Sequence, residues 1–236
     1  PFYNKLIIPF LVPFLFAMAI GPKLKWIKSN IKSKSHLILF LIISFLLSFI
    51  ILKKLDKNFL INTILITSAF YLFFVTLNDF VIKKSKNLSQ NIAHFGFSLL
   101  MLSILFNNIL STEVITNLKI GETFNSEKIK ISFESVNKKD GKNYKAIIGK
   151  FNIESENGNI DIFNPELRIY NQPNVATSEA DIKTNLFLDR FITMNLVQNQ
   201  NYFNIRYQTK PLMIWIWISV ILISFGGIIS LIKKQL

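Results

Sequence analysis

The chain has 236 residues, half of them apolar, and it carries 23 phenylalanines and a formal net charge of +13. Its mean hydropathy of +0.38 is typical of an integral membrane protein and excludes an ordinary soluble globule. The chain has no cysteine, which excludes internal disulfides and thiolate metal sites. Its first residue is Pro1 rather than Met, so we expect a fragment or a processed piece.

The positive charge is distributed unevenly along the chain. The stretch Ser111–Lys210 carries thirteen bases and twelve acids, whereas the rest of the chain carries fourteen lysines and two acids. Lysines confined to the apolar regions are typical of the ends of membrane helices, where they set the topology. We therefore expect contact with membrane lipid and no nucleic-acid partner.

Five apolar segments are long enough, or nearly so, to cross about 30 Å of hydrocarbon. The first contains two prolines, which predict a kink in that helix. The five predicted spans are Leu6–Ile20, Leu37–Leu52, Phe59–Ile82, Ile92–Leu110 and Leu212–Ile232.

The lysines also predict the orientation of these spans. Ten of them follow the first, third and last spans, and four lie at the opposite ends. Because cytoplasmic loops are enriched in lysine, the ten-lysine side is predicted to be cytoplasmic. We expect a four-helix transmembrane region at 1–110, an extracytoplasmic β domain at 111–210, and a last transmembrane helix with a short cytoplasmic tail at 211–236.

The outer stretch has the pattern of an antiparallel β domain. Lys130–Val136 alternates polar and apolar residues, and Tyr144–Glu154, Phe187–Val197 and Tyr202–Tyr207 are further strand candidates. Turn signals that contain Gly or Pro separate them. We predict about six strands in a sandwich or partly open barrel. The fold class is thus an integral membrane helical bundle, of about five helices, with an inserted extracytoplasmic antiparallel β domain.

His94 is the most unusual side chain, because it lies within the fourth apolar span of a chain that has two histidines. An ionisable or metal-ligating side chain in hydrocarbon needs a partner inside the bundle. One interpretation is an axial ligand of a haem iron, and the other is a histidine hydrogen-bonded to a neighbouring helix. His36 follows a basic loop, and we predict an interfacial position without a ligand role.

The junction before the last span combines bases and aromatics: Arg206, Tyr207, Lys210, Trp215 and Trp217. Pro211 suits the first turn of the last helix, where its missing N–H costs nothing. The junction is either an interfacial aromatic belt or a platform beside a planar or anionic ligand. Gly226 and Gly227 predict close packing of this helix on a neighbour.

Acidic side chains outside the β domain are few. Asp79 precedes Lys83 by four residues near the end of the third span, and this spacing predicts an ion pair on one helix face. Within the β domain the acids lie beside bases and there is no histidine, so an independent hydrolytic site is not expected.

Several motifs, in order along nearly the whole chain, resemble those of the CcmF family of cytochrome c-type biogenesis proteins. Gly21-Pro22 with Trp26 resembles that family's "GIGP…RW" helix end, and Ala93-His94-Phe95-Gly96 resembles its "AHxG" helix. Three later stretches resemble its "GPNYRA", "EKRxY…TEAAI" and C-terminal signatures, namely 140–146, 166–182 and 206–227. The chain is therefore similar to the C-terminal portion of that family.

The resemblance implies a part of a cytochrome c haem lyase, which joins haem vinyl groups to the thiols of apocytochrome c. His94 would be one axial ligand of a membrane haem b. The other axial ligand, and the residues that bind the substrate haem, would come from a preceding part of the family's chain. The catalytic residues would also lie outside this chain, so whether it is itself an enzyme is left open.

The implied partners are other cytochrome c maturation subunits, apocytochrome c, a haem chaperone and quinol. The implied location is the bacterial inner membrane with the β domain in the periplasm, and the mitochondrial inner membrane is the alternative. A second hypothesis is a non-catalytic scaffold, in which a membrane-tethered β domain binds assembly partners and His94 only packs.

Overall fold

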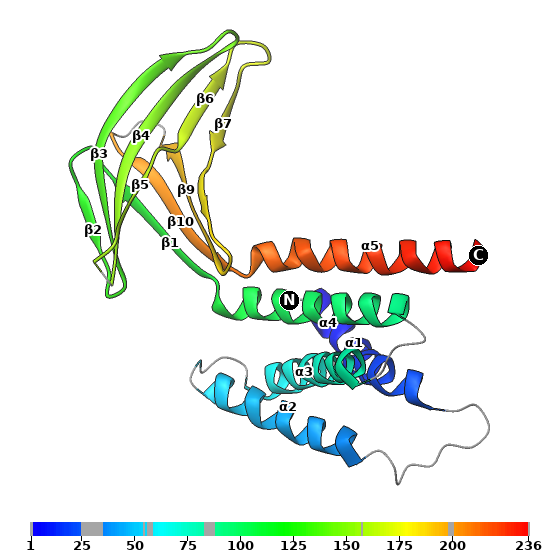
Figure 1. Ribbon diagram of the computed structural model, residues 1–236. Coiled ribbons are helices and arrows are strands. Elements are labelled where there is room, and N and C mark those ends of the chain that lie inside the picture. The colour runs from blue at the N-terminus through cyan, green and yellow to red at the C-terminus, as the bar shows by residue number, and fades with distance from the viewer. Residues whose placement is uncertain are drawn as a thin grey trace. The chain divides into compact units, whose positions relative to one another are not determined.

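The computed structural model describes residues 2–24, 35–53, 55, 59–82, 88–156, 158–197 and 201–235 (Figure 1). It divides into two compact units, each with a core of its own. The helical unit comprises Pro1–Ile109 and Leu212–Leu236, and the β domain comprises Leu110–Pro211.

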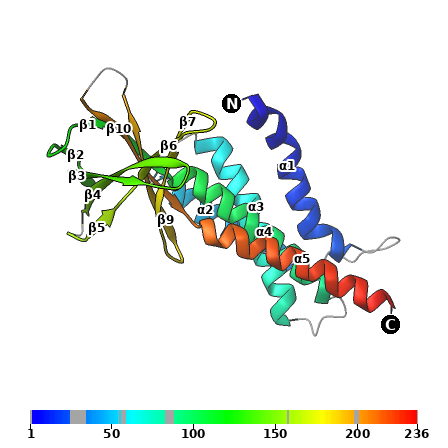
Figure 2. The ribbon, with the colours of Figure 1, turned by 90° about the horizontal axis from the view of Figure 1, so that it is seen from above.

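Five helices form the helical unit, and they can be followed in Figure 2. Among the described residues, all five contain a stretch that is long and apolar enough to cross a membrane, as predicted. The first helix continues through both of its prolines and ends in a short 3₁₀ turn, η1. The bounds are α1 Phe2–Ile20, η1 Gly21–Lys23, α2 Ser35–Lys53, α3 Phe59–Ile82, α4 Leu88–Leu110 and α5 Met213–Gln235.

The helices α3 and α4 run antiparallel, as successive membrane crossings require. The rings of Phe70 and Phe106 lie 5.8 Å apart, and those of Phe80 and Phe95 lie 5.6 Å apart. Residue numbers therefore rise along α3 in the direction in which they fall along α4. The start of α4 lies beside the end of α3, which places residue 94 at the end of the bundle where α3 finishes.

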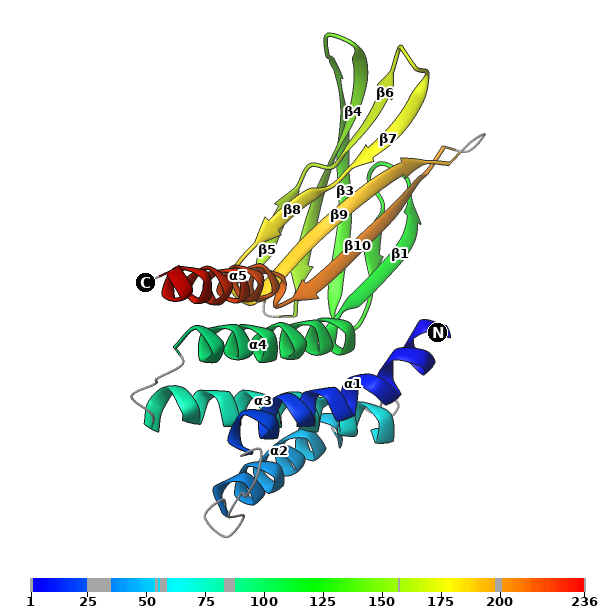
Figure 3. The same cartoon turned by 90° about the vertical axis from the view of Figure 1, so that its right-hand side faces the viewer.

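The helices α4 and α5 are also antiparallel and pack very closely (Figure 3). A Cβ atom on Gly96 would lie 3.0 Å from the backbone nitrogen of Ile223, and one on Gly226 would lie 2.8 Å from that of Ala93. Both glycines thus permit an approach that a side chain would block. Gly227 meets nothing within 4 Å, so only Gly226 fulfils the packing role predicted for the pair.

An ion pair joins the end of α1 to the end of α3. The Nζ atom of Lys23 lies 2.6 Å from Oδ1 of Asp79, and the two side chains are only 7% and 15% exposed. The predicted partner of Asp79, Lys83, lies outside the described residues. A pair 56 positions apart in sequence shows that α1 and α3 end on the same side of the bundle, as alternating crossings require.

The β domain is a sandwich of two antiparallel sheets. One sheet has the order β1-β10-β9-β8, and the other has the order β2-β3-β4-β6-β7 with β5 paired to β4. The bounds are β1 Thr112–Leu118, β2 Thr123–Asn125, β3 Ile129–Asp140, β4 Tyr144–Ser155, β5 Ile160–Phe163, β6 Glu166–Tyr170, β7 Val175–Glu179, β8 Asp181–Thr184, β9 Leu188–Leu196 and β10 Phe203–Pro211.

The described part of the β domain has ten strands rather than the predicted six or so. The additional strands are short, three to seven residues each, and carry too little alternation to be recognised by pattern. All but β7 pair with one of the long strands β3, β4, β9 and β10, and β7 pairs with β6. Aromatic side chains fill the core between the sheets, and the rings of Phe133 and Phe151 stack 4.3 Å apart.

Candidate functional site

His94 lies in α4, six residues after its first residue, or about 9 Å along the helix axis. Its neighbours in sequence face different helices. Ala93 and Gly96 contact α5, whereas Phe95 packs on α3 and Phe97 meets an α1 ring. Residues three apart share a helix face, so His94 lies on the same side of α4 as Phe97. Three helices therefore converge around this turn of α4.

The imidazole of His94 is half-buried in the helical unit. Among the residues that the structure describes, it makes no hydrogen bond or ion pair. The hydrogen bond to a neighbouring helix, which was one of the two interpretations of this residue, is thus not found there. A polar group in hydrocarbon needs a partner. A ring nitrogen of His94 is therefore available to bind a ligand or a metal ion.

Aromatic side chains cover α4 immediately beside His94. The ring of Phe95 lies 5.5 Å from that of Phe73 and 5.6 Å from that of Phe80. These three partly buried rings, two from α3 and one from α4, form an aromatic cluster beside this turn.

Polar groups lie one helical turn away, toward the start of α4. The Nδ2 atom of Asn91 donates to the backbone carbonyl of Asp79 at 3.5 Å, a long contact. Asp79 in turn holds Lys23, so α1, α3 and α4 are joined at this end by polar contacts. The arrangement fixes the start of α4, and with it the position of His94.

The structure gives separate roles to the junction residues. Arg206 and Lys210 share the outer face of β10, whereas Tyr207 points inward between the sheets because side chains alternate along a strand. Tyr207 is 3% exposed, and burial raises the pKa of its hydroxyl, which keeps it neutral. Trp215 and Trp217 belong to α5 in the other unit, and Trp217 is 66% exposed.

The last helix begins later than predicted. Pro211 is the final residue of β10 and pairs with Leu188, whereas we expected it in the first helical turn. Leu212 then adopts a positive φ of 60°, and its carbonyl accepts from the backbone N–H of Trp215 at 3.1 Å. Because Pro211 is the last residue of β10, its missing N–H is tolerated, and the strand can include it.

Arg206 is bound across the strand pair on the outer face of the sheet. Its Nε donates to Glu113 of β1, and Nε2 of Gln208 donates to the same carboxylate oxygen at 2.6 Å. The hydrogen bonds from Gln208 and Arg206 lower the pKa of Glu113. Arg206 is thus already paired within the domain, and Lys210 is the other base on this face of β10.

His36, the second histidine, lies in the first turn of α2 and meets the ring of Phe40 at 6.1 Å between centroids. Among the described residues no cluster of three or more His, Asp or Glu side chains could hold a metal ion.

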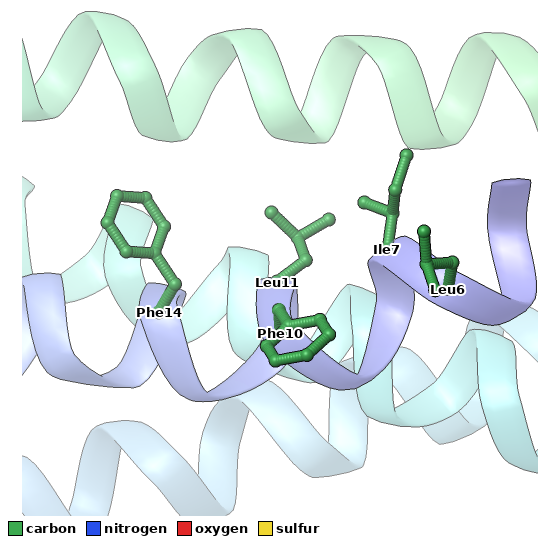
Figure 4. A pocket seen from close by; sticks show the side chains of 5 residues that line it. All are labelled: Leu6, Ile7, Phe10, Leu11 and Phe14. Atoms are coloured by element: carbon green, nitrogen blue, oxygen red, sulfur yellow. The ribbon is translucent and has the colours of Figure 1, made fainter.

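Two of the hollows in the described part of the chain have well-defined linings. One, of about 500 Å³, is lined by α1 side chains without a single polar atom: Leu6, Ile7, Phe10, Leu11 and Phe14 (Figure 4). The other, of about 380 Å³, lies in the β domain between the β1–β10 pair and the turn before β3, and Tyr207 lines it. The first can hold only apolar groups, such as lipid chains.

The fold and the residues around His94 define a class, a multi-pass membrane protein that carries a β-sandwich between two of its helices. Residues 109–211 match the family model described as CcmF C-terminal beta-sandwich. Those bounds nearly coincide with the β domain.

Particular relatives extend the similarity over the whole chain. All of it aligns with the cytochrome c-type biogenesis protein CcmF of Haemophilus influenzae, at 24% identity over 39% of that protein. It also aligns over its full length with CcmF of Escherichia coli, at 20% identity over 38% of that protein. The chain thus resembles the C-terminal portion of CcmF, as its motifs predicted, and spans about two-fifths of the length of these relatives.

A solved structure titled cytochrome c heme lyase CcmF has the same fold. It superposes with a TM-score of 0.73 and 20% sequence identity, and the match covers 97% of this chain and 40% of that one. The predicted fold class, a helical membrane bundle with a β domain, is therefore confirmed.

Proposed function

We propose that this chain is the membrane-anchored C-terminal part of a cytochrome c haem lyase, in which His94 supplies one axial ligand to a membrane haem b. The second axial ligand would come from the part of the protein that precedes this portion in the relatives. The observation that carries the proposal is the half-buried imidazole of His94, which has no hydrogen-bond partner among the described residues of a membrane helix.

The residues around His94 fit such a group by their chemistry. A neutral imidazole is a common axial ligand, and the rings of Phe73, Phe80 and Phe95 provide an aromatic wall. Gly96 and Gly226 allow α5 to approach α4, which narrows the bundle beside His94. A haem bound there would supply one-electron chemistry, and the axial ligand and burial would tune its potential.

The proposal places the protein in the bacterial inner membrane, with the β domain in the periplasm. Support comes from the lysines, ten of which lie on the side opposite to the β domain, and from the bacterial relatives. The partners would be other cytochrome c maturation subunits, apocytochrome c, a haem chaperone and quinol.

The junction residues have separate roles in this proposal. Trp217, exposed on α5, would sit at the interface of the membrane. Lys210, on the outer face of β10, would meet anionic groups of a partner or ligand. Arg206 would contribute to such binding only after its ion pair with Glu113 is broken. Tyr207 would contribute by packing in the core of the domain.

An optical spectrum of the full-length protein that contains this chain tests the proposal. We expect a reduced-minus-oxidised spectrum of a low-spin b haem in the wild type and its loss in His94→Ala. A pyridine haemochrome assay gives the haem content. The matched control is His36→Ala, because it removes the chain's other histidine and should leave the spectrum unchanged.

An unchanged spectrum and haem content in His94→Ala would overturn the proposal. The scaffold hypothesis, with His94 as a packing residue, would then be the better account. Equal loss in both histidine variants would point to damaged folding, and circular dichroism of the two proteins distinguishes that outcome from loss of a ligand.

A further inference from the structure

The hairpin between β3 and β4 ends in a cluster of four lysines, which we call the lysine tip: Lys138, Lys139, Lys142 and Lys145. All four are exposed. Asp140 is the one acid within this stretch, and it lies opposite Lys145 in the strand register. A dense group of exposed like charges is unfavourable by itself, so a role in binding is a natural reason for it.

The lysine tip carries a larger net positive charge than the β domain as a whole. Outside residues 138–145, the stretch from Ser111 to Lys210 holds nine bases and eleven acids. The tip is therefore positive and the remainder of the domain slightly negative. Such a separation produces a directional field that can steer a charged partner.

The other bases of the domain are mostly paired, whereas the tip lysines are not. Six ion pairs occupy Lys130, Lys150, Arg168, Lys183, Arg190 and Arg206. Within the described part of the chain, none of the four tip lysines has an ion-pair partner. Their charge is thus available to another molecule.

The base of the lysine tip is rigid. Tyr144 and Tyr170 face each other across the β4–β6 pair with ring centroids 5.5 Å apart, and the guanidinium of Arg168 lies 5.0 Å above the Tyr144 ring. The N–H of Asn171 donates to the carbonyl of Asn143 at 3.0 Å, which joins the two turns. A fixed aromatic base lowers the entropy lost when a partner binds.

The lysine tip is remote from the chain ends of the β domain (Figures 1 and 3). The start of β3 lies beside Thr112 and Thr209, which are close to the two ends, because one hollow is lined by all of them. From there β3 runs for twelve residues, or about 36 Å, to the tip. The lysine tip thus lies at the end of the β domain opposite to its two chain ends.

We propose that the lysine tip is a docking surface for an acidic segment of a soluble partner protein. Carboxylates would pair with the tip lysines, and the Tyr144–Tyr170 base would pack beneath the segment. Nucleic acid is a weaker match, because the rest of the domain is slightly negative and would repel a long polyanion. Binding at the lysine tip would require neither His94 nor a haem.

The test uses the full chain in nanodiscs of neutral lipid and a fluorescein-labelled hexaglutamate peptide as the probe. Anisotropy gives the Kd at about 0.02 M and about 0.3 M salt, and a hexalysine peptide controls for sign. We expect binding of hexaglutamate alone and marked weakening at the higher salt concentration. In Lys138→Gln/Lys142→Gln, we expect Kd to rise about fivefold, since each exposed pair contributes modestly.

The matched control is Lys119→Gln/Lys128→Gln, which removes the same charge from exposed lysines elsewhere in the β domain. We expect this variant to change Kd less than twofold. Equal weakening by both double variants, or no binding of hexaglutamate, would overturn the proposal. Amine labelling can also show whether the tip lysines contact lipid. If they are protected only in nanodiscs of anionic lipid, the tip binds the membrane, and the proposal is overturned as well.

Discussion

The helical unit buries polar as well as apolar side chains, whereas the β domain buries mainly apolar ones. In the β domain the phenylalanines Phe133 and Phe151 are 1% and 0% exposed. In the helical unit Ser48 and Ser219 are fully buried, whereas Phe10 is 75% exposed. The β domain is thus organised for water and the helical unit for hydrocarbon, in which an exposed ring costs nothing.

The difference also shows how each unit satisfies its polar groups. The buried hydroxyl of Ser48 donates to the Ser44 carbonyl at 2.7 Å, and that of Ser219 donates to the Trp215 carbonyl at 2.6 Å. Hydroxyls that bond to their own helix can be buried without a distant partner. The imidazole of His94 makes no such bond among the described residues, which is why it stands out in the helical unit.

The largest effect that tests this comparison is expected from a pair of Phe→Ala substitutions. Phe151→Ala leaves a cavity in the sandwich and should cost about 3–5 kcal/mol of unfolding free energy. Phe10→Ala removes a ring that faces outward and should cost less than about 0.5 kcal/mol. Urea unfolding of the detergent-solubilised chain, followed by circular dichroism, measures both. Similar costs would refute the difference in burial between Phe151 and Phe10.

The ion pair of the helical unit should show a somewhat smaller effect. Asp79→Asn leaves the ammonium of Lys23 in a buried site without its carboxylate, at a cost of about 3 kcal/mol. The double variant Lys23→Met/Asp79→Leu should recover most of that loss, because no buried charge remains. Thermal unfolding of the single and double variants measures the coupling. Additive losses would show that the pair contributes little.

The smallest effect concerns Glu113 in the β domain. Its pKa is lowered from 4.5 in the folded state by the hydrogen bonds from Gln208 and Arg206, so its stabilising contribution is present above 4.5. That contribution is lost as the pH falls through the lower, folded-state pKa. In Glu113→Gln the fall in stability between about pH 5 and pH 3 should be slightly shallower. An unchanged pH profile would contradict this pairing.

The sequence predicts the helices well because hydropathy and length decide them. The span Phe59–Ile82 agrees with α3 at both ends, and the other four agree to within a few residues. In the β domain the four strands predicted by residue range correspond to β3, β4, β9 and β10. Short strands such as β2 and β8 were not predicted, because they exist through pairing with β3 and β9 rather than through a pattern of their own.

Long-range contacts explain the remaining differences. Local spacing suggested Lys83 for Asp79, and that pair stays a prediction because Lys83 lies outside the described residues. The pair of Asp79 with Lys23 was not predicted, because only the packing of α1 on α3 brings these residues near each other. Tyr207 lies in the core, because the register of β10 with β9 turns it inward and Arg206 outward. The rarity of His94 could be recognised from composition alone, whereas the structure was needed to show that it has no hydrogen-bond partner among the described residues.

The close contact of α4 with α5 has a consequence for how such a protein can change in evolution. In the helical unit, antiparallel packing at Gly96 and Gly226 keeps the end of α4 near the start of α5. In the β domain, Thr112 pairs with Thr209, so its two ends are neighbours as well. The β domain is therefore joined to the helices through two neighbouring chain ends. A different domain with adjacent ends could replace it without altering a single membrane crossing.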